Sequence, residues 1–295
     1  GILTQGGTIL GTSRQRYIPG KDIIDENGNS LIPLMRDTYN RLNLDCLIIM
    51  GGNGTQKSAK LIADAGMNVI TLPKTIDNDI WGTDTTFGFQ SAVDIATNVI
   101  DYIHSTACSH GRTFVVELMG RDAGWLTLHA GIASGADAIV LDVKTGSGAI
   151  MHTLEGSIEL GKAMVDIGTL AGKPVTAIVT GMQEPLGTHV GNALEVKDAI
   201  DVLSGRTKGA LLEVSLLLGS HMLVCAGRAA TPEEGRALLL EKLNSGAGLE
   251  KFKEMIRAQG GDPRVCDDVT LLPQAKVVRK VYCGCTGYMA QMDTQ

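Results

Sequence analysis

The sequence predicts an α/β protein in which helices flank a parallel sheet. Short apolar runs recur between residues 45 and 182, glycine or proline ends most of them, and amphipathic helical patterns separate them. Strands that alternate with helices form parallel sheets, because the helix supplies the crossover between neighbouring strands. The 295 residues are enough for two domains.

The first part of the chain alternates strand and helix. Residues 45–66 predict a buried strand, a glycine turn and a helix, and residues 67–79 predict a second strand with a polar loop. A helix is predicted over 87–107, a third buried strand over 113–120, and a short helix within 121–135. Apolar residues at helical spacing indicate the helices, and continuous apolar runs indicate the strands.

A fourth predicted strand, at 137–143, leads into a more helical part. A long amphipathic helix at 151–172 and a buried strand at 173–182 follow it. The helical segment 191–258 is predicted to hold helices at 191–204, 208–228, 232–246 and 248–258. Residues 274–293 alternate apolar and polar side chains, which predicts a short β-rich C-terminal piece.

The amino-acid composition indicates which binding partners and which cellular location to expect for the protein. The net charge is −6 and no stretch is rich in Lys and Arg, which argues against nucleic acid or an anionic membrane as a partner. Neither a signal peptide nor a bilayer-length apolar run is predicted, so we expect a cytoplasmic protein. The six cysteines indicate mainly buried free thiols in a reducing compartment, and the Cys283-Gly-Cys285 pair alone is a weak metal signal.

Two loops lie where parallel strands end, which is where open α/β sheets bind ligands. Residues 51–55, rich in glycine, follow a strand and open a helix, so their backbone N–H groups suit a phosphate, although a steric glycine turn explains them equally. The next loop places Asp77 and Asp79 beside Lys74 and Thr75. These residues could supply the base, the cation and the metal ligand of a phosphoryl transfer, and the alternative is a solvated turn capped by Asp.

The order and spacing of these motifs resemble phosphofructokinase over residues 1–140. The segments that carry the resemblance are 5–14, 51–55, 73–89, 109–127 and 130–140. It implies a transferase that moves a phosphoryl group from ATP or pyrophosphate to the 1-hydroxyl of fructose 6-phosphate with the help of Mg²⁺. It also implies a homo-oligomer, because Arg112 would reach fructose 6-phosphate in a neighbouring subunit.

The resemblance assigns a role to each matched residue. Asp77 would be the general base, Thr75 would hold the incoming phosphoryl group, and Asp79 would support the metal and the base. Arg14 and Arg121 would neutralise phosphate charge. The further predicted substrate contacts are Met119 and Gly120, and the predicted nucleotide or phosphate contacts are Gly52, Asn53, Gly54, Thr55 and Lys74.

The chain departs from the family pattern at Asn53, which stands where the family has a metal-binding aspartate. A unit charge pair at about 4 Å is worth roughly 4 kcal/mol at an effective dielectric of about 20. Loss of that interaction from the transition state would slow the reaction up to about a thousandfold. Gly54 is typical of ATP enzymes and Lys74 of pyrophosphate enzymes, and we favour ATP.

Other family segments would fall outside the matched part. The first strand and the glycine-rich phosphate loop would precede Gly1, and the later sugar-phosphate residues would follow Val140. We therefore expect the predicted activity to be impaired.

From residue 137 the sequence resembles a different family, pyrimidine-nucleoside (thymidine) phosphorylase. The resemblance implies the central α/β domain of that family and the start of its C-terminal β-rich domain. The predicted organisation is therefore a phosphofructokinase-like half, a phosphorylase-like α/β and helical part, and a truncated β-rich piece, at 1–140, 141–272 and 273–295.

The second resemblance implies a monovalent cation site, for an ion such as K⁺, at Leu186, His189 and Asp198. The first two would bind through backbone carbonyls, and we expect the His189 side chain to face solvent. A routine surface carboxylate is the alternative for Asp198. The phosphate loop and the pyrimidine contacts of that family fall before the match begins.

The strand at 137–143 is therefore predicted to be a junction, and the chain a chimera. Both families have a strand of this kind, but core packing is specific to single methylene groups, so the sequence alone does not show that the flanking helices pack. Three functions stay open: phosphofructokinase-type transfer, pyrimidine-nucleoside phosphorolysis, and a catalytically inactive scaffold.

Overall fold

The computed structural model describes residues 16–18, 22–25, 27–120, 124–149, 151–290 and 292. The chain forms two compact units, residues 1–93 and 94–295. The predicted domain boundaries near residues 140 and 272 stay predictions.

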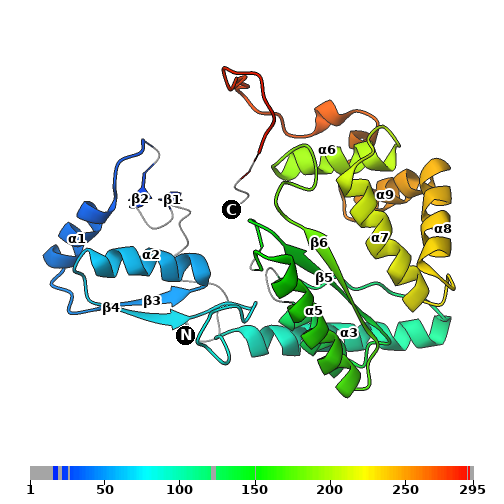
Figure 1. Ribbon diagram of the computed structural model, residues 1–295, viewed down its shortest axis with the longest axis horizontal. Helices are drawn as coiled ribbons and strands as arrows, with labels where there is room; N and C mark the ends of the chain where they lie inside the picture. Colours follow the sequence, from blue (N-terminus) through cyan, green and yellow to red (C-terminus); the bar gives the residue numbers. More distant parts are fainter. Residues whose placement is uncertain are drawn as a thin grey trace. The chain divides into compact units, whose positions relative to one another are not determined.

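The first unit contains a strand–helix–strand crossover, as predicted. Strands β3 (Leu47–Gly51) and β4 (Val69–Pro73) pair in parallel, from Leu47 opposite Val69 to Gly51 opposite Pro73. Helix α2 (Asn53–Asp64) connects them and contacts both strands (Figure 1). The crossover brings the ends of both strands, and the start of α2, to one edge of the sheet.

Three elements of this unit were not predicted. Strands β1 (Arg16–Ile18) and β2 (Asp22–Ile24) form a short antiparallel pair, and helix α1 (Ile32–Arg41) follows them. Proline lies in the first turn of α1, where its missing N–H leaves no helical hydrogen bond unmade.

Helix α3 (Phe89–His110) crosses the boundary between the two units at Val93 and Asp94. It confirms the helix predicted over 87–107. Throughout the described ranges, no helix is both long enough and apolar enough to cross a bilayer.

The second unit is built around one parallel strand pair with helices packed on it. Strand β5 (Ile139–Thr145) pairs with β6 (Val175–Gly181) over the full length of both strands. Helices α4 (Trp125–Ala133) and α5 (Leu154–Leu170) pack against β5, and Figure 1 shows α5 beside the pair. The buried core consists of Leu128, Ile139, Leu141, Val143 and Met164.

The helices on both sides of the predicted junction therefore pack on the junction strand. Leu128 of α4 is 0% exposed and Met164 of α5 is 2% exposed, and both lie in one core with β5. A Cβ atom added to Gly131 would lie 2.8 Å from Cδ1 of Ile139. Helix α4 thus approaches the strand closely because glycine occupies this position.

Four further helices occupy the predicted helical segment. They are α6 (Asn192–Leu203), α7 (Ala210–Cys225), α8 (Pro232–Asn244) and α9 (Ala247–Ala258), followed by the 3-10 turns η2 (Pro263–Cys266) and η3 (Val269–Leu271). Thr231 caps α8 by accepting a hydrogen bond from the backbone N–H of Glu234, whose carboxylate in turn accepts from the backbone N–H of Ala230. Val202, Leu212 and Leu216 form the core between these helices.

The strand predicted over 113–120 does not form. Its side chains include Phe114, Val115 and Val116, which are 44%, 68% and 39% exposed, and the backbone has no regular structure. Val115 lines a cavity of about 420 Å³ together with Val140 of β5, so the segment lies near β5 without pairing. An apolar run becomes a strand only where a neighbour accepts its hydrogen bonds, and propensity alone does not provide one.

The predicted β-rich C-terminal piece is also not observed among residues 274–290 and 292, which contain no strand. Val277, Val278, Val281 and Tyr282 are all at least 80% exposed. The alternating pattern is present in the sequence, but this segment pairs with no strand in the described part of the chain, so the pattern has no sheet to stabilise.

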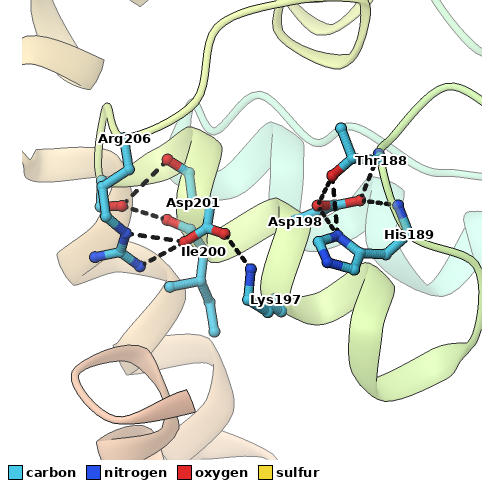
Figure 2. Close-up of polar contacts among 8 residues, drawn as sticks. Thr188, His189, Lys197, Asp198, Ile200, Asp201 and Arg206 are labelled. Atoms are coloured by element: carbon cyan, nitrogen blue, oxygen red, sulfur yellow. Dashed lines mark hydrogen bonds and ion pairs between the residues drawn. The ribbon is translucent and has the colours of Figure 1, made fainter. Parts of the chain in front are cut away.

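A partly buried carboxylate, that of Asp201, joins the end of α6 to the turn that follows it (Figure 2). Asp201 accepts a hydrogen bond from Nζ of Lys197 at 2.7 Å and lies 2.8 Å from a guanidinium nitrogen of Arg206. The hydrogen bond from Lys197 is the main reason that the pKa of Asp201 lies below its usual range, and Arg206 adds to this effect. Asp201 therefore stabilises the fold in its charged form.

We expect truncation of Leu128 to destabilise the second unit strongly. Leu128→Ala should lower the free energy of unfolding by about 2–5 kcal/mol, because it leaves a cavity beside β5. Urea unfolding followed by the fluorescence of Trp125, which packs on this core, measures the change.

The matched control is Leu170→Ala on α5, because Leu170 is 89% exposed. Its effect should stay within about 0.5 kcal/mol. Equal effects of the two substitutions would show that α4 does not pack on the junction strand.

We also expect the contribution of Asp201 to depend on pH. Its folded pKa is lowered, so the carboxylate stabilises the fold above its unfolded value of 3.8 and loses this effect as the pH falls through the folded pKa. Asp201→Asn should cost about 1–2 kcal/mol at neutral pH and progressively less below the unfolded value. Urea unfolding at a series of pH values tests this, with exposed Asp166→Asn as the control, and a pH-independent difference would contradict it.

Candidate functional site

The loop that leaves β4 is held in a fixed shape by its own polar groups. The side-chain oxygen of Asn78 accepts a hydrogen bond from the backbone N–H of Thr86 at 2.8 Å, and Oγ1 of Thr86 donates to the backbone oxygen of Thr75 at 2.8 Å. Asn78 has a φ of 53°, in the left-handed region that asparagine tolerates better than most residues. Neither Asn78 nor Thr86 was predicted to have a role, although asparagine inside a turn indicates one.

Within this loop Thr75 and Asp77 contact each other. Oγ1 of Thr75 donates to Oδ2 of Asp77 at 3.2 Å and accepts from the backbone N–H of Asp77 at 3.2 Å. The other carboxylate oxygen, Oδ1, is buried and has no hydrogen-bond partner among the described residues. A buried unpaired carboxylate oxygen is unfavourable unless a proton donor or a cation contacts it. The Asp77 carboxylate is therefore able to accept a proton or contact a cation.

A second contact joins this loop to the start of α2. The amide Nδ2 of Asn53 donates to Oδ2 of Asp79 at 2.8 Å and lies 3.3 Å from the backbone oxygen of Asp79. Oδ1 of Asp79 is buried and, like Oδ1 of Asp77, has no described partner. The loop thus has two buried carboxylate oxygens free for a ligand, and Asn53 provides a hydrogen-bond donor in place of a third carboxylate.

The start of α2 leaves backbone N–H groups beside these side chains. Gly52 is the N-cap, and the described residues provide no side-chain hydrogen bond to cap the helix. A Cβ atom on Gly52 would lie 3.6 Å from Cβ of Thr75, whereas one on Gly54 would meet no atom within 4 Å. Thr55 packs against Gly51, where a Cβ atom would collide with it. The first turn of α2 therefore faces Thr75 with uncapped donors, which is an arrangement that suits phosphate.

The remaining predicted site residues do not join this group of polar side chains. Lys74 is exposed, and its backbone N–H donates to the backbone oxygen of Gly51 at 3.0 Å. Arg112, Met119 and Gly120 belong to the second unit, where Arg112 and Met119 are exposed and the backbone N–H of Arg112 donates to the oxygen of Ala107 at the end of α3. Arg14 and Arg121 lie outside the described residues. The structure therefore brings together the residues of the first unit: Gly52, Asn53, Gly54, Thr55, Thr75, Asp77 and Asp79.

The second predicted site centres on Asp198 of α6, which is buried at 6% exposure and is not a routine surface carboxylate (Figure 2). Its oxygens accept hydrogen bonds from the backbone N–H groups of Thr188 and His189 at 2.9 and 3.0 Å. The hydroxyl of Thr188 lies 2.9 Å away and Nδ1 of His189 lies 2.7 Å away. The expectation that the His189 side chain faces solvent is therefore wrong, because the buried carboxylate attracts its ring.

Burial by itself would raise the pKa of Asp198, but hydrogen bonds from His189 and Thr188 outweigh burial and lower it. Both carboxylate oxygens are thus engaged by protein donors. Leu186, the third predicted cation residue, is 37% exposed. A cation at Asp198 would compete with these donors, so the present donor set does not suit K⁺, and the K⁺ site stays a prediction. Among the described residues, no group of three or more His, Cys, Asp or Glu side chains is arranged so that it could hold a metal ion.

Comparison with known families supports both parts of the sequence prediction. The model of the family Phosphofructokinase matches residues 1–165. The model of the family Glycosyl transferase family, a/b domain, matches residues 126–249. The two matches overlap over α4, β5 and most of α5, which includes the predicted junction.

Individual relatives follow the same division. An ATP-dependent 6-phosphofructokinase of Spirochaeta thermophila is 54% identical over 167 residues, which cover 55% of this chain and 45% of that protein. A pyrimidine-nucleoside phosphorylase of Staphylococcus aureus is 52% identical over 161 residues, which cover 55% of this chain and 37% of that protein. The phosphofructokinase structure from Saccharomyces cerevisiae aligns with a TM-score of 0.40 at 28% identity and covers 68% of this chain and 27% of that one. The chain therefore spans less than half the length of these curated relatives.

The family match includes the complete group of described polar residues at the ends of β3 and β4. The chimera predicted from the sequence is consistent with a second family match that begins at residue 126. By the match over its first 165 residues, the chain belongs to the phosphofructokinase family and continues into a part similar to pyrimidine-nucleoside phosphorylases.

Proposed function

We propose that the first unit supports phosphofructokinase-type transfer of a phosphoryl group to the 1-hydroxyl of fructose 6-phosphate, at a reduced rate. The observation that carries this proposal is the buried, unpaired Oδ1 of Asp77, next to the hydroxyl of Thr75 and the uncapped start of α2. A base, a hydroxyl donor and a phosphate-binding helix start are the parts that transfer to an alcohol requires.

In this proposal Asp77 accepts the proton of the attacking hydroxyl through its free oxygen. Thr75 already holds the other oxygen of the same carboxylate at 3.2 Å, which fixes the orientation of the base. The backbone N–H groups of Asn53, Gly54 and Thr55 would bind phosphoryl oxygens, because the first turn of a helix favours negative charge. Arg112 would act in a neighbouring subunit, so the proposal includes a homo-oligomer.

The carboxylate of Asp79 would hold Mg²⁺. Its buried unpaired oxygen suits a hard cation, and Mg²⁺ is usually held by one or two carboxylates together with substrate phosphates. When bound, Mg²⁺ neutralises charge on the transferring phosphoryl group. Asn53 cannot add a charge to this set, which is the reason that we propose a reduced rate.

We propose ATP as the phosphoryl donor. The open space beside Gly54 leaves room for a nucleotide, and the relative from Spirochaeta thermophila is named for ATP. Nucleoside phosphorolysis is not proposed for the second unit, because both oxygens of Asp198 already accept hydrogen bonds from described protein donors.

We expect Asp77→Asn to abolish most of the activity. The amide keeps the size of the side chain but cannot accept the proton, so kcat/KM for fructose 6-phosphate should fall by about a hundredfold or more. A coupled assay with ATP or pyrophosphate as the donor measures this.

The matched control is Asp84→Asn, which makes the same chemical change at an exposed position in the same loop. It should keep the activity of the unaltered chain. Absence of turnover by the unaltered chain with both donors would reject the proposed function, and full activity of Asp77→Asn would reject the base.

We expect Asn53→Asp to make the site dependent on Mg²⁺. The new carboxylate would stand where an amide now donates to Asp79 at 2.8 Å, so the two charges repel unless a cation lies between them. The melting temperature should fall without Mg²⁺ and rise more on its addition than in the unaltered chain. With Mg²⁺, turnover should increase between about tenfold and a thousandfold.

Asn53→Ala is the control for this test, because it removes the hydrogen bond without adding charge. It should lower the melting temperature and leave the response to Mg²⁺ unchanged or weaker. Equal Mg²⁺ responses of the aspartate variant and the unaltered chain would contradict a cation at this position.

A further inference from the structure

Two exposed cysteines stand two residues apart in the irregular C-terminal segment. Cys283 and Cys285 are both free thiols and both exposed. The backbone bends at Gly284 and Cys285, and Gly284 has a φ of 74°, which is in the left-handed region that favours glycine. Neither the phosphoryl-transfer site nor the Asp198 cluster includes these thiols.

The bend places the thiol of Cys283 beside the backbone of Cys285. Sγ of Cys283 donates a hydrogen bond to the backbone oxygen of Cys285 at 2.9 Å. Disulfides form between residues whose Cα atoms are about 4.4–6.8 Å apart, and a bend between two residues i and i+2 shortens their Cα separation toward this range. The geometry therefore allows the two sulfurs to meet after side-chain rotation, without movement of a packed core.

We propose that Cys283 and Cys285 form a dithiol that reacts with low-molecular-weight disulfides, such as glutathione disulfide, and closes to an intrachain disulfide. The thiolate of Cys283 attacks one sulfur of glutathione disulfide, forms a mixed disulfide and releases one glutathione thiolate. The sulfur of Cys285 then attacks Sγ of Cys283 and releases the second glutathione. The two protein thiols are oxidised, glutathione disulfide is reduced to two glutathione molecules, and the two thiol protons pass to the released thiolates.

The surroundings of Cys283 favour the first step. Hydrogen bonds that Cys285 makes to the Cys283 sulfur, first from its backbone and then from its side chain, lower the pKa of the Cys283 thiol, so a larger share of it is thiolate, which is the nucleophile. Cys266 shows the opposite condition, because burial raises the pKa of its thiol. A disulfide in so small a ring is strained and exposed, and such disulfides are readily reduced again, so the pair responds reversibly to the redox state of its surroundings.

The other cysteines of the chain serve as internal controls. Cys108, at the end of α3, and Cys225, at the end of α7, are exposed free thiols. Neither has another cysteine within ten positions of the sequence. Each can form a mixed disulfide with glutathione, but neither has a neighbour in the sequence to resolve it.

The test incubates the full reduced chain in buffers of increasing glutathione disulfide, followed by acid quenching, alkylation and mass spectrometry. Trypsin cleaves after Lys280 and leaves both cysteines in one peptide that begins at Val281. We expect this peptide to become two hydrogens lighter without retaining glutathione, whereas the Cys225 peptide should gain one glutathione.

Four variants make the test specific. Cys283→Ser and Cys285→Ser should each stop at a mixed disulfide, and Gly284→Val should slow closure because valine disfavours the positive φ. Cys225→Ser should leave closure unchanged. Persistence of both thiols, or mixed disulfides at the same level as on Cys225, would overturn the proposal.

Discussion

The packing of α4 and α5 on β5 is the interaction on which the second unit depends. Leu128 and Met164 are buried in one core with Ile139 of β5, and glycine at position 131 lets α4 lie close to that strand. Both family matches include this strand. Because interiors are close-packed, a junction between families is tolerated only where the side chains from both sides fit. The junction strand meets that condition here, because its alternating buried positions, Ile139, Leu141 and Val143, lie in one core with α4 and α5.

The first unit holds the candidate site, but it leaves much of the apolar surface of strand β3 exposed. In the first unit α2 contacts β3 and β4, but Ile48 and Met50 of β3 are 65% and 62% exposed. Parallel sheets in α/β proteins are normally covered on both faces. The polar group at the ends of β3 and β4 therefore rests on a sheet with an exposed apolar face, and its geometry depends largely on local hydrogen bonds such as those of Asn78 and Thr86.

Local patterns predicted helices α2 to α9 and strands β3 to β6, whereas helix α1 was missed and pairing between distant segments limited the rest. Helix α8, with its Thr231 cap, is encoded by neighbouring residues, and β3 to β6 lie next to crossover helices. The apolar run at 113–120 and the alternating segment at 274–293 were also predicted as strands from local pattern, but the described residues 113–120, 274–290 and 292 have no paired neighbour and contain no strand. The contact of Asn53 with Asp79 joins residues 26 positions apart, and sequence reasoning identified both residues but not their hydrogen bond.

That hydrogen bond explains how a family site can persist with one charge fewer. An aspartate at position 53 would repel Asp79 whenever no cation is bound, so the loop would be stable only with its ligand. The amide of Asn53 instead joins α2 to the loop by a neutral donor, and one oxygen of Asp79 stays unpaired. The substitution therefore favours a preformed site over a tightly bound cation. Since a preformed base and helix start still bring the reacting groups together, we expect catalysis to be slow but not absent.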